Sequence, residues 1–295
     1  EDNVAATAEY YMNPGEGIMY GPLDIEKIEC SDDMYCHDVK YNGLFKFSES
    51  CLPCHNMTVR GKELETTYSE WQSIQHLGMG GQVPCQECHM PFNQETGHHS
   101  HEFIGVDIDL TMAVPDDSLQ YKSVEKLLQN SLEIKFEDII IEPSKLKILI
   151  SIQSLTAHSL PSGTSFSREA WLETVVKDVD KDSILFSSGT LQDPTSNLDL
   201  SDSDLLLYSS NLLDAGGNII HSVTDAYDID RKMLPGLKSD EHLYKVDGSF
   251  ISGTQVNVSS MMHFRAFKPE MLSEDLLLRQ PVFVMEKIDT IFTIP

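Results

Sequence analysis

Two short cysteine–histidine motifs carry the most specific chemistry in this sequence. They are Cys51-Leu52-Pro53-Cys54-His55 and Cys85-Gln86-Glu87-Cys88-His89. Cys-x-x-Cys-His is the attachment pattern of c-type haem, in which both thiols bond to one porphyrin and the following His binds its iron. The sequence therefore predicts two covalently bound c-type haems, with attachment residues Cys51, Cys54, Cys85 and Cys88 and proximal iron ligands His55 and His89.

The same four cysteines also allow a zinc site. Two Cys-x-x-Cys pairs can close a tetrahedral thiolate cage around Zn²⁺. A zinc cage does not need a His directly after each pair, yet both pairs have one here. The chain also holds further His residues that could serve as sixth ligands of haem iron. The pattern favours haem, and zinc is the alternative.

The remaining cysteines, Cys30 and Cys36, belong to neither motif. Covalent haem attachment takes place outside the cytoplasm, in an oxidising compartment that permits disulfides. We therefore predict a Cys30–Cys36 disulfide. The alternative is a third, irregular haem site, because Cys36-His37 ends like the haem motif and Asp33 stands where the first Cys would be.

Charge and hydropathy restrict the location and the partners. The chain of 295 residues has 21 basic and 47 acidic side chains, which gives a net charge of −26. Nucleic acid and anionic lipid are therefore poor partners. No apolar run approaches the length that a membrane span needs, so we expect no membrane-spanning segment. We expect an exported protein, extracellular, periplasmic or at the cell surface, whose signal peptide has been removed.

The elements that must position these motifs change in character along the chain. Turn residues at Pro115-Asp116-Asp117 suggest a break there, with a dihaem domain over residues 1–120 and a second domain over 121–295. Thr67-Tyr68-Ser69-Glu70 is typical of a capping box, followed at helical spacing by Trp71. This short helix leads into the second haem motif, so we expect Trp71 to pack against a porphyrin.

The second domain reads as short strands with turn signals between them. The expected strands cover 134–141, 146–152, 171–176, 184–186, 211–213, 219–220, 255–267 and 281–294. Strands of this number and spacing indicate a β-sandwich. The predicted class is therefore α+β: an irregular, haem-packed N-terminal region with a short helix, followed by an all-β, sandwich-like domain for assembly or docking.

Longer stretches of sequence show a family pattern. Tyr68-Ser69-Glu70-Trp71 precedes the second motif, and after it come Met90-Pro91 and Ser100-His101-Glu102-Phe103-Ile104-Gly105. Farther on lie His158-Ser159-Leu160-Pro161-Ser162-Gly163, Arg168, Trp171-Leu172 and Phe264-Arg265-Ala266-Phe267. These stretches resemble the multihaem c-type cytochromes related to the cytochrome c-554 group, which include cytochromes that form extracellular filaments. The later stretches resemble the start and the end of the β-domain in that group.

The resemblance implies an electron-transfer protein without its own substrate chemistry. It implies distal iron ligands at His37 and His101, then His158, with His76 as a further candidate. Its partners would be other copies of itself in a filament, or redox partner cytochromes. The alternatives are a discrete periplasmic carrier, or a cytochrome subunit of a haem reductase or peroxidase complex. An enzyme would need an open iron with acid–base residues beside it.

Overall fold

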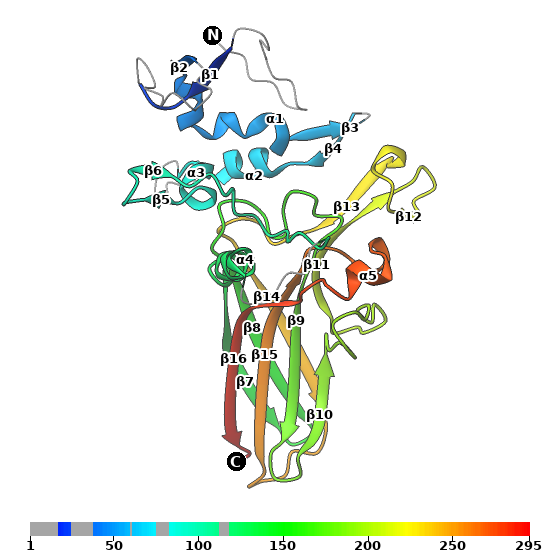
Figure 1. Ribbon diagram of the computed structural model, residues 1–295. Coiled ribbons are helices and arrows are strands. Elements are labelled where there is room, and N and C mark those ends of the chain that lie inside the picture. Colours follow the sequence, from blue (N-terminus) through cyan, green and yellow to red (C-terminus); the bar gives the residue numbers. More distant parts are fainter. Residues whose placement is uncertain (1–16, 25–37, 60, 75–82, 112–117) are drawn as a thin grey trace. The chain divides into compact units, whose positions relative to one another are not determined.

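The computed structural model describes residues 17–24, 38–59, 61–74, 83–111 and 118–295 (Figure 1). The chain divides into two compact units, Glu1–Phe103 and Ile104–Pro295. The second unit begins earlier than the sequence break near residues 115–117. The reason is apolar burial, because Ile108 and Leu110 are buried and Ile108 belongs to the core cluster of the second unit.

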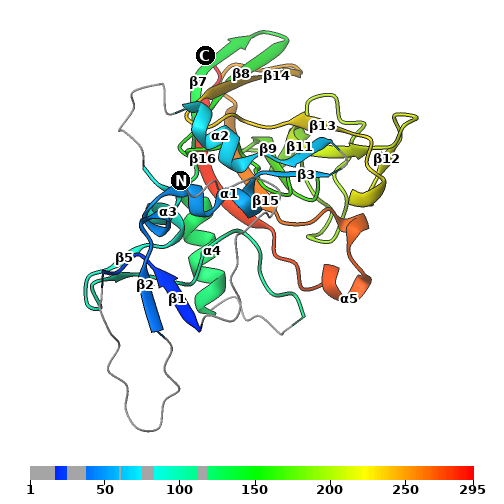
Figure 2. The same ribbon diagram turned by 90° about the horizontal axis from the view of Figure 1, so that it is seen from above.

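The N-terminal unit consists of short elements. In chain order these are β1 (Ile18–Gly21), β2 (Asp38–Tyr41), two 3-10 turns (Gly43–Lys46 and Ser48–Ser50), α1 (Leu52–His55), β3 (Met57–Val59), β4 (Lys62–Glu65), α2 (Thr67–Ile74), α3 (Cys85–His89), β5 (Phe92–Asn93) and β6 (His98–His99). The strands form three separate pairs, β1–β2, β3–β4 and β5–β6. Helices α1, α2 and α3 lie close together in both ribbon views (Figures 1 and 2).

Helix α2 is the helix that the sequence predicts before the second motif, but its N-terminal hydrogen bonds differ. The helix begins at Thr67, so Thr66 is the residue that precedes it. The Thr66 hydroxyl donates to Glu70 Oε1 at 2.7 Å. The Glu70 N–H donates to the Thr66 carbonyl at 2.8 Å. Thr67 is therefore the first residue of the helix and not the residue before it, as the predicted capping box requires, and the Thr66 hydroxyl bonds the Glu70 carboxylate.

The second unit is a sandwich of two antiparallel sheets (Figure 1). The smaller sheet has the order β14-β8-β7, from β7 (Leu132–Glu142), β8 (Lys145–Ser154) and β14 (Ser239–Asp247). The larger sheet follows the order β12-β11-β9-β15-β16, with β10 on β9 and β13 on β11. Its strands are β9 (Glu169–Asp178), β10 (Ser183–Ser188), β11 (Leu206–Leu213), β12 (Ile219–Ile220), β13 (Asp228–Lys232), β15 (Gln255–Arg265) and β16 (Phe283–Thr293). The fold is α+β, as predicted, and all eight predicted strands are present.

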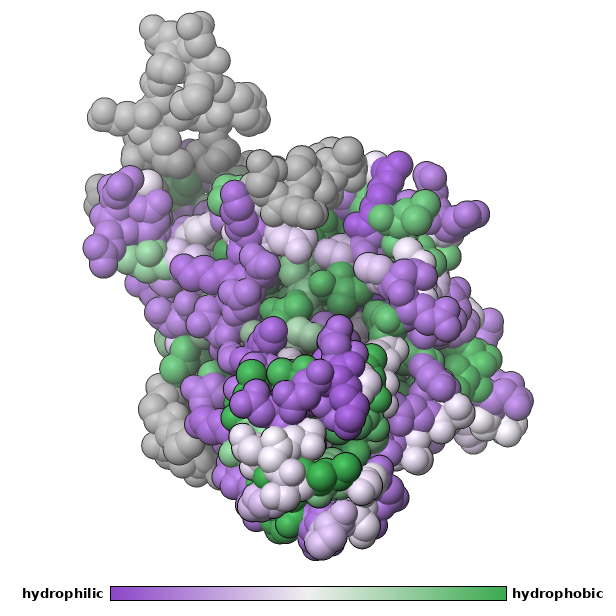
Figure 3. All heavy atoms as spheres, turned by 90° about the horizontal axis from the view of Figure 1, so that it is seen from below, coloured by the Kyte–Doolittle hydropathy of each residue, from purple (hydrophilic) through white to green (hydrophobic). Residues whose placement is uncertain are grey.

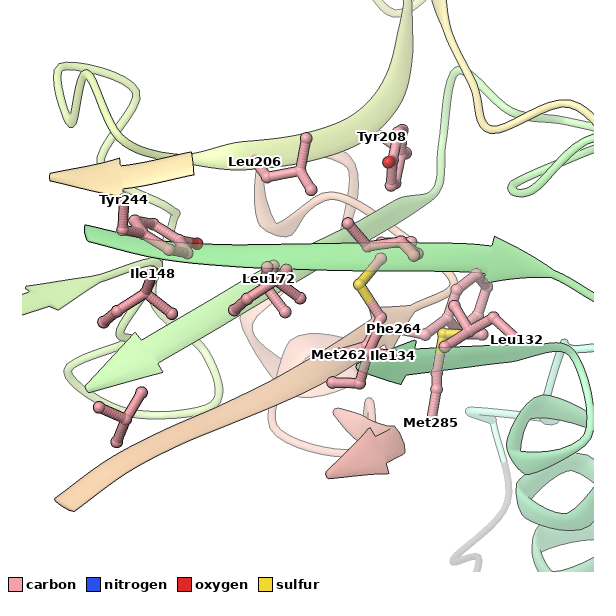
Figure 4. Packing of buried hydrophobic residues seen from close by; sticks show 14 of the residues in the cluster. Leu132, Ile134, Ile148, Leu172, Leu206, Tyr208, Tyr244, Met262, Phe264 and Met285 are labelled. Atoms are coloured by element: carbon pink, nitrogen blue, oxygen red, sulfur yellow. The ribbon is translucent and has the colours of Figure 1, made fainter. Parts of the chain in front are cut away.

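The core of this unit lies between the two sheets. Strand β8 alternates strictly, so that Leu146, Ile148, Ile150 and Ile152 are fully buried. A strand places alternate side chains on one face, which explains why this set points into the sandwich. From the larger sheet, Leu172, Met262 and Phe264 join the same cluster (Figure 4). Burial of this continuous cluster is the main stabilisation of the β unit.

Two helices that the sequence analysis did not predict accompany the sandwich, α4 (Leu119–Gln129) and α5 (Glu274–Leu277). In α4 the Ser118 hydroxyl caps the helix by accepting from the Tyr121 N–H at 3.1 Å. Val124 and Leu128 are buried, and the Tyr121 ring lies 4.9 Å from the ring of Phe283 on β16. The apolar spacing of 121, 124 and 128 is helical, so this signal was present in the sequence.

A buried cation connects the larger sheet to the long segment between β10 and β11. Arg265 is fully buried, and its Nε donates to Glu169 Oε2 at 2.5 Å. Its Nη1 donates to the Ser196 carbonyl at 2.8 Å, and the guanidinium lies 5.3 Å from the Trp171 ring centre. Burial raises the pKa of Glu169, and Arg265 opposes this shift. Trp171 and Arg265, which carried part of the family resemblance, thus have a structural role.

This pair gives a stability prediction. Replacing Glu169 by Ala leaves the buried Arg265 cation unpaired, which we expect to destabilise the β unit by roughly 3–5 kcal/mol. The matched control is Glu133→Ala, because Glu133 pairs with Lys135 in an exposed ion pair. We expect little change from it. The free energy of unfolding of both variants is measured in urea, with the unfolding followed by hydrogen exchange in β9 and β15. Equal losses of stability in the two variants would contradict the assigned role of Glu169.

Candidate haem-attachment site

Both Cys-x-x-Cys-His motifs lie on short helices of the N-terminal unit. The first occupies α1, with Cys51 as the residue before the helix, and the second forms α3. In each motif the first cysteine is half-buried and the second, Cys54 or Cys88, is exposed. Each helix therefore presents an accessible thiol next to a His, as covalent attachment of a porphyrin requires.

The first cysteines of the two motifs meet. The Cys51 thiol, together with the Ser48 hydroxyl, hydrogen-bonds to Cys85 and lowers the pKa of the Cys85 thiol. The bond to Cys85, followed by burial, raises the pKa of Cys51. Cys51 and Cys85 are thus neighbours in the structure, although they are 34 positions apart in the sequence.

Two buried polar side chains hold the motifs in this position. Gln86 is 7% exposed, and its Nε2 donates to the carbonyls of Phe47 at 2.9 Å and Phe45 at 3.2 Å, and to Ser50 Oγ at 3.1 Å. Ser48 is 1% exposed, and its Oγ accepts from the Cys85 N–H at 3.0 Å. Helix α3 is therefore bonded to the turn that leads into the first motif. Sequence reasoning missed both residues, because Gln86 occupies a variable position of the motif.

Helix α2 is hydrogen-bonded to a residue next to each motif. Ser69 donates to Asn56 Oδ1 at 2.8 Å, directly after the first motif. Trp71 Nε1 donates to the Val83 carbonyl at 2.9 Å, just before the second motif. The Trp71 ring also lies 5.4 Å from the Tyr68 ring. The structure thus gives Trp71 a role in positioning α3, while its predicted contact with a porphyrin stays a prediction.

The proximal candidate His55 is bonded to a carboxylate. Its Nδ1 lies 2.8 Å from Glu65 Oε1. The hairpin of β3 and β4 turns the chain back after α1 and pairs Met57 with Glu65. With Nδ1 bonded to Glu65, Nε2 is the nitrogen of His55 that would bind iron, and the bond would fix the ring orientation.

The burial pattern of the N-terminal unit fits a large apolar cofactor. Among its described residues, Leu64 and Tyr68 are the buried hydrophobic side chains, with 4% and 8% exposure. Its exposed large hydrophobic side chains are Met19, Leu23, Tyr41, Phe45, Phe47, Val83, Phe92 and Phe103. The described residues of this unit therefore expose more large hydrophobic side chains than they bury. Porphyrin attached at α1 and α3 would cover apolar surface of this kind.

The alternative zinc site finds no support in the arrangement of the thiols. Within the described ranges, no three Cys, His, Asp or Glu side chains come together in a way that could hold a metal ion. A tetrahedral cage requires four ligands around one point. Cys51 and Cys85 meet, but Cys54 and Cys88 do not complete a cage with them. The four thiols, as the structure places them, therefore do not form a zinc cage.

The candidate distal ligands divide between the two units. His101 is exposed, and its ring stacks on Phe103 with 6.3 Å between centres. His158 belongs to the β unit, where its Nδ1 lies 2.9 Å from the Ser159 carbonyl oxygen. That contact is compatible with a structural role, and ligation by either residue stays a prediction. The other predicted residues, His37, His76, Cys30 and Cys36, lie outside the described residues.

Two other histidines have defined surroundings. The Nδ1 atom of His99, on β6, lies 2.5 Å from the Met90 carbonyl, next to the second motif. The side chain of His99 is half-buried. His242, which the sequence analysis did not consider, contacts the Asp204 carbonyl at 2.9 Å through Nε2. Burial lowers the pKa of His242, in accord with a neutral structural residue.

Comparison with solved structures shows a similarity in fold over most of this chain. A penta-haem cytochrome c552 from Thermochromatium tepidum matches 92% of this chain with a TM-score of 0.66 and 18% identity. The chain is similar in fold to a penta-haem cytochrome. The match spans 63% of the length of the cytochrome, so this chain corresponds to less than two thirds of it. No protein-family model matches the sequence, and no curated protein matches it.

Two further structures match only in part. β-Glucosidase 3B from Thermotoga neapolitana covers 55% of this chain and 17% of its own, with a TM-score of 0.20 and 13% identity. The outer membrane decahaem cytochrome OmcA covers 55% of this chain and 22% of its own, with a TM-score of 0.17 and 8% identity. Similarities this low carry no argument about the chain.

The contacts of Gln86 give a prediction for the haem-loaded protein. Gln86→Ala removes the donor from two backbone carbonyls, and leaving a buried acceptor unsatisfied costs about 1–3 kcal/mol. We expect faster hydrogen exchange in α3. Glu87→Ala is the matched control, because Glu87 is the next residue of the same helix and is exposed. Equal exchange in the two variants would show that Gln86 does not hold the motifs together.

Proposed function

We propose that this chain is an exported dihaem c-type cytochrome that transfers single electrons. The observation that carries the proposal is that hydrogen bonds of Gln86 and Ser48 join the two Cys-x-x-Cys-His helices, in a unit whose described residues bury few apolar side chains. The similarity in fold to a penta-haem cytochrome supports it. When bound, each haem supplies a one-electron couple between ferrous and ferric iron.

Different residues of the chain would attach each haem and bind its iron. Cys51 and Cys54 attach the first haem, and His55 is its proximal ligand. Cys85, Cys88 and His89 have these roles for the second haem. The distal positions would be filled from His37, His101, His158 and His76. Two His ligands on each iron leave no open position, which favours electron transfer over substrate chemistry.

The proposal includes an oxidising location, extracellular, periplasmic or at the cell surface, and the Cys30–Cys36 disulfide. Covalent haem and disulfide bonds are both compatible with that environment. No helix in the described part of the chain combines the length and the apolarity that a membrane crossing needs. Seen from the end of the sandwich where β9 turns into β10, hydrophilic residues surround smaller apolar patches (Figure 3). The acidic surface favours a redox partner with a basic docking face.

Haem content and carbon monoxide binding test this proposal together. In protein matured with its haem-attachment machinery, we expect a c-type pyridine haemochrome spectrum and an intact mass that corresponds to two haems. We also expect no carbon monoxide adduct after reduction, because saturated iron has no open position. A third haem would overturn the dihaem count. Carbon monoxide binding would instead favour a subunit of a haem reductase or peroxidase.

We further propose that the β unit mediates assembly of copies into an extracellular filament, with a discrete carrier as the alternative. The β unit carries neither haem motif, so we assign it a role other than haem attachment. Among the described strands, β14 pairs with β8 alone and thus offers an edge to an added strand. Exposed apolar side chains, including Ile184, Ile251 and Ile291, are available for contact.

Electron microscopy of the undenatured, matured protein distinguishes the two forms. Filaments with a short axial repeat are the expected result, because one contact repeated head to tail forms an open polymer. Shielding of β14 in the polymer, measured by hydrogen exchange, would identify the contact. Single particles at every concentration would contradict the filament and support a discrete carrier.

A further inference from the structure

The carboxylate of Glu65 is placed directly behind the proximal ligand of the first haem motif. Its Oε1 lies 2.8 Å from His55 Nδ1, and its side chain is 13% exposed, whereas that of His55 is 58% exposed. We propose that Glu65 is a positioning residue that fixes the His55 ring and lowers the reduction potential of the haem bound there. This inference rests on the proposed function, since it requires that haem.

The position of Glu65 is fixed by the fold on both sides. On one side, β4 pairs with β3, so that Glu65 lies opposite Met57, two residues after His55. Leu64 is buried and anchors the strand. On the other side, helix α2 begins two residues later, at Thr67. Because its backbone is held at both ends, Glu65 loses little further freedom when its carboxylate bonds the imidazole.

The direction of the effect follows from charge. A carboxylate that accepts the Nδ1–H of a ligating His raises the basicity of the ring, because the ring gains negative character. A more basic ligand stabilises the ferric ion more than the ferrous ion, since the ferric ion carries more positive charge. The bond therefore favours the oxidised state and lowers the potential. A carbonyl acceptor in the same place would fix the ring without this full charge.

The decisive variant is Glu65→Gln in the full-length, haem-loaded protein. Glutamine keeps the size of the side chain and can still accept the Nδ1 hydrogen bond, but it removes the charge. We expect the redox equilibrium constant of one haem to change about tenfold toward the reduced state, which is ~59 mV for a one-electron couple. The other haem should keep its potential. Spectroelectrochemical titration measures both, and the EPR g-values of the same ferric haem should shift with its ligand field.

A matched control separates the contact from general electrostatics. Glu63→Gln removes the same charge from the same strand, at an exposed position. We expect a much smaller shift from it. Equal shifts in the two variants, or an unchanged potential in E65Q with both haems attached, would overturn the inference. Wild-type protein without two haems would overturn the proposed function instead, so the two failures are distinguishable.

A second variant keeps the inference testable if E65Q fails to retain its haem. Glu65→Asp keeps the charge but shortens the side chain, which lengthens the contact with His55. We expect it to retain both haems and to raise the same potential by less than a tenfold change in the equilibrium constant. An unchanged potential in the Asp variant would overturn the role of Glu65, because a purely structural contact does not alter the redox equilibrium.

Discussion

One constraint stands out in the described part of the N-terminal unit, which is that few of its apolar side chains are buried. Its described residues bury Leu64 and Tyr68, whereas the β unit buries a continuous cluster between two sheets. Small domains with so little core require a cross-link, a metal or a cofactor. The unit instead exposes a set of large apolar side chains beside two haem-attachment motifs. Covalent haem supplies both a cross-link and apolar surface. The proposed cofactor would therefore also stabilise the fold of this unit.

In this unit, directional hydrogen bonds position the two haem motifs, which apolar packing would do in a domain with a larger core. Gln86 and Ser48 join the two motifs, and Trp71 joins α2 to the segment before α3. Glu65 orients the His55 ring. Buried polar contacts of this kind specify one geometry more strictly than apolar packing, because an unsatisfied partner is expensive. That strictness suits ligands whose orientation sets the properties of a bound metal.

The parts of the molecule that could be predicted are those encoded locally. Cys-x-x-Cys-His is a local covalent pattern, and the strands of the sandwich follow from period-2 alternation. Strand β14 was missed because charged residues dominate it, and only Tyr244 and Val246 are buried. Glu65 and Gln86 could not be predicted as site residues. Their roles arise from the β3–β4 hairpin and from the docking of α3, which are tertiary features absent from any local pattern.

Hydrogen exchange with and without haem attachment tests the central claim most directly. Matured protein would be compared with the same chain produced without the attachment machinery. If haem replaces the core of residues 1–103, their amides should lose protection without haem, while β8, β9 and β15 keep theirs. Full protection of α1, α2 and α3 in the haem-free chain would contradict the account, because the unit would then fold on its own side chains.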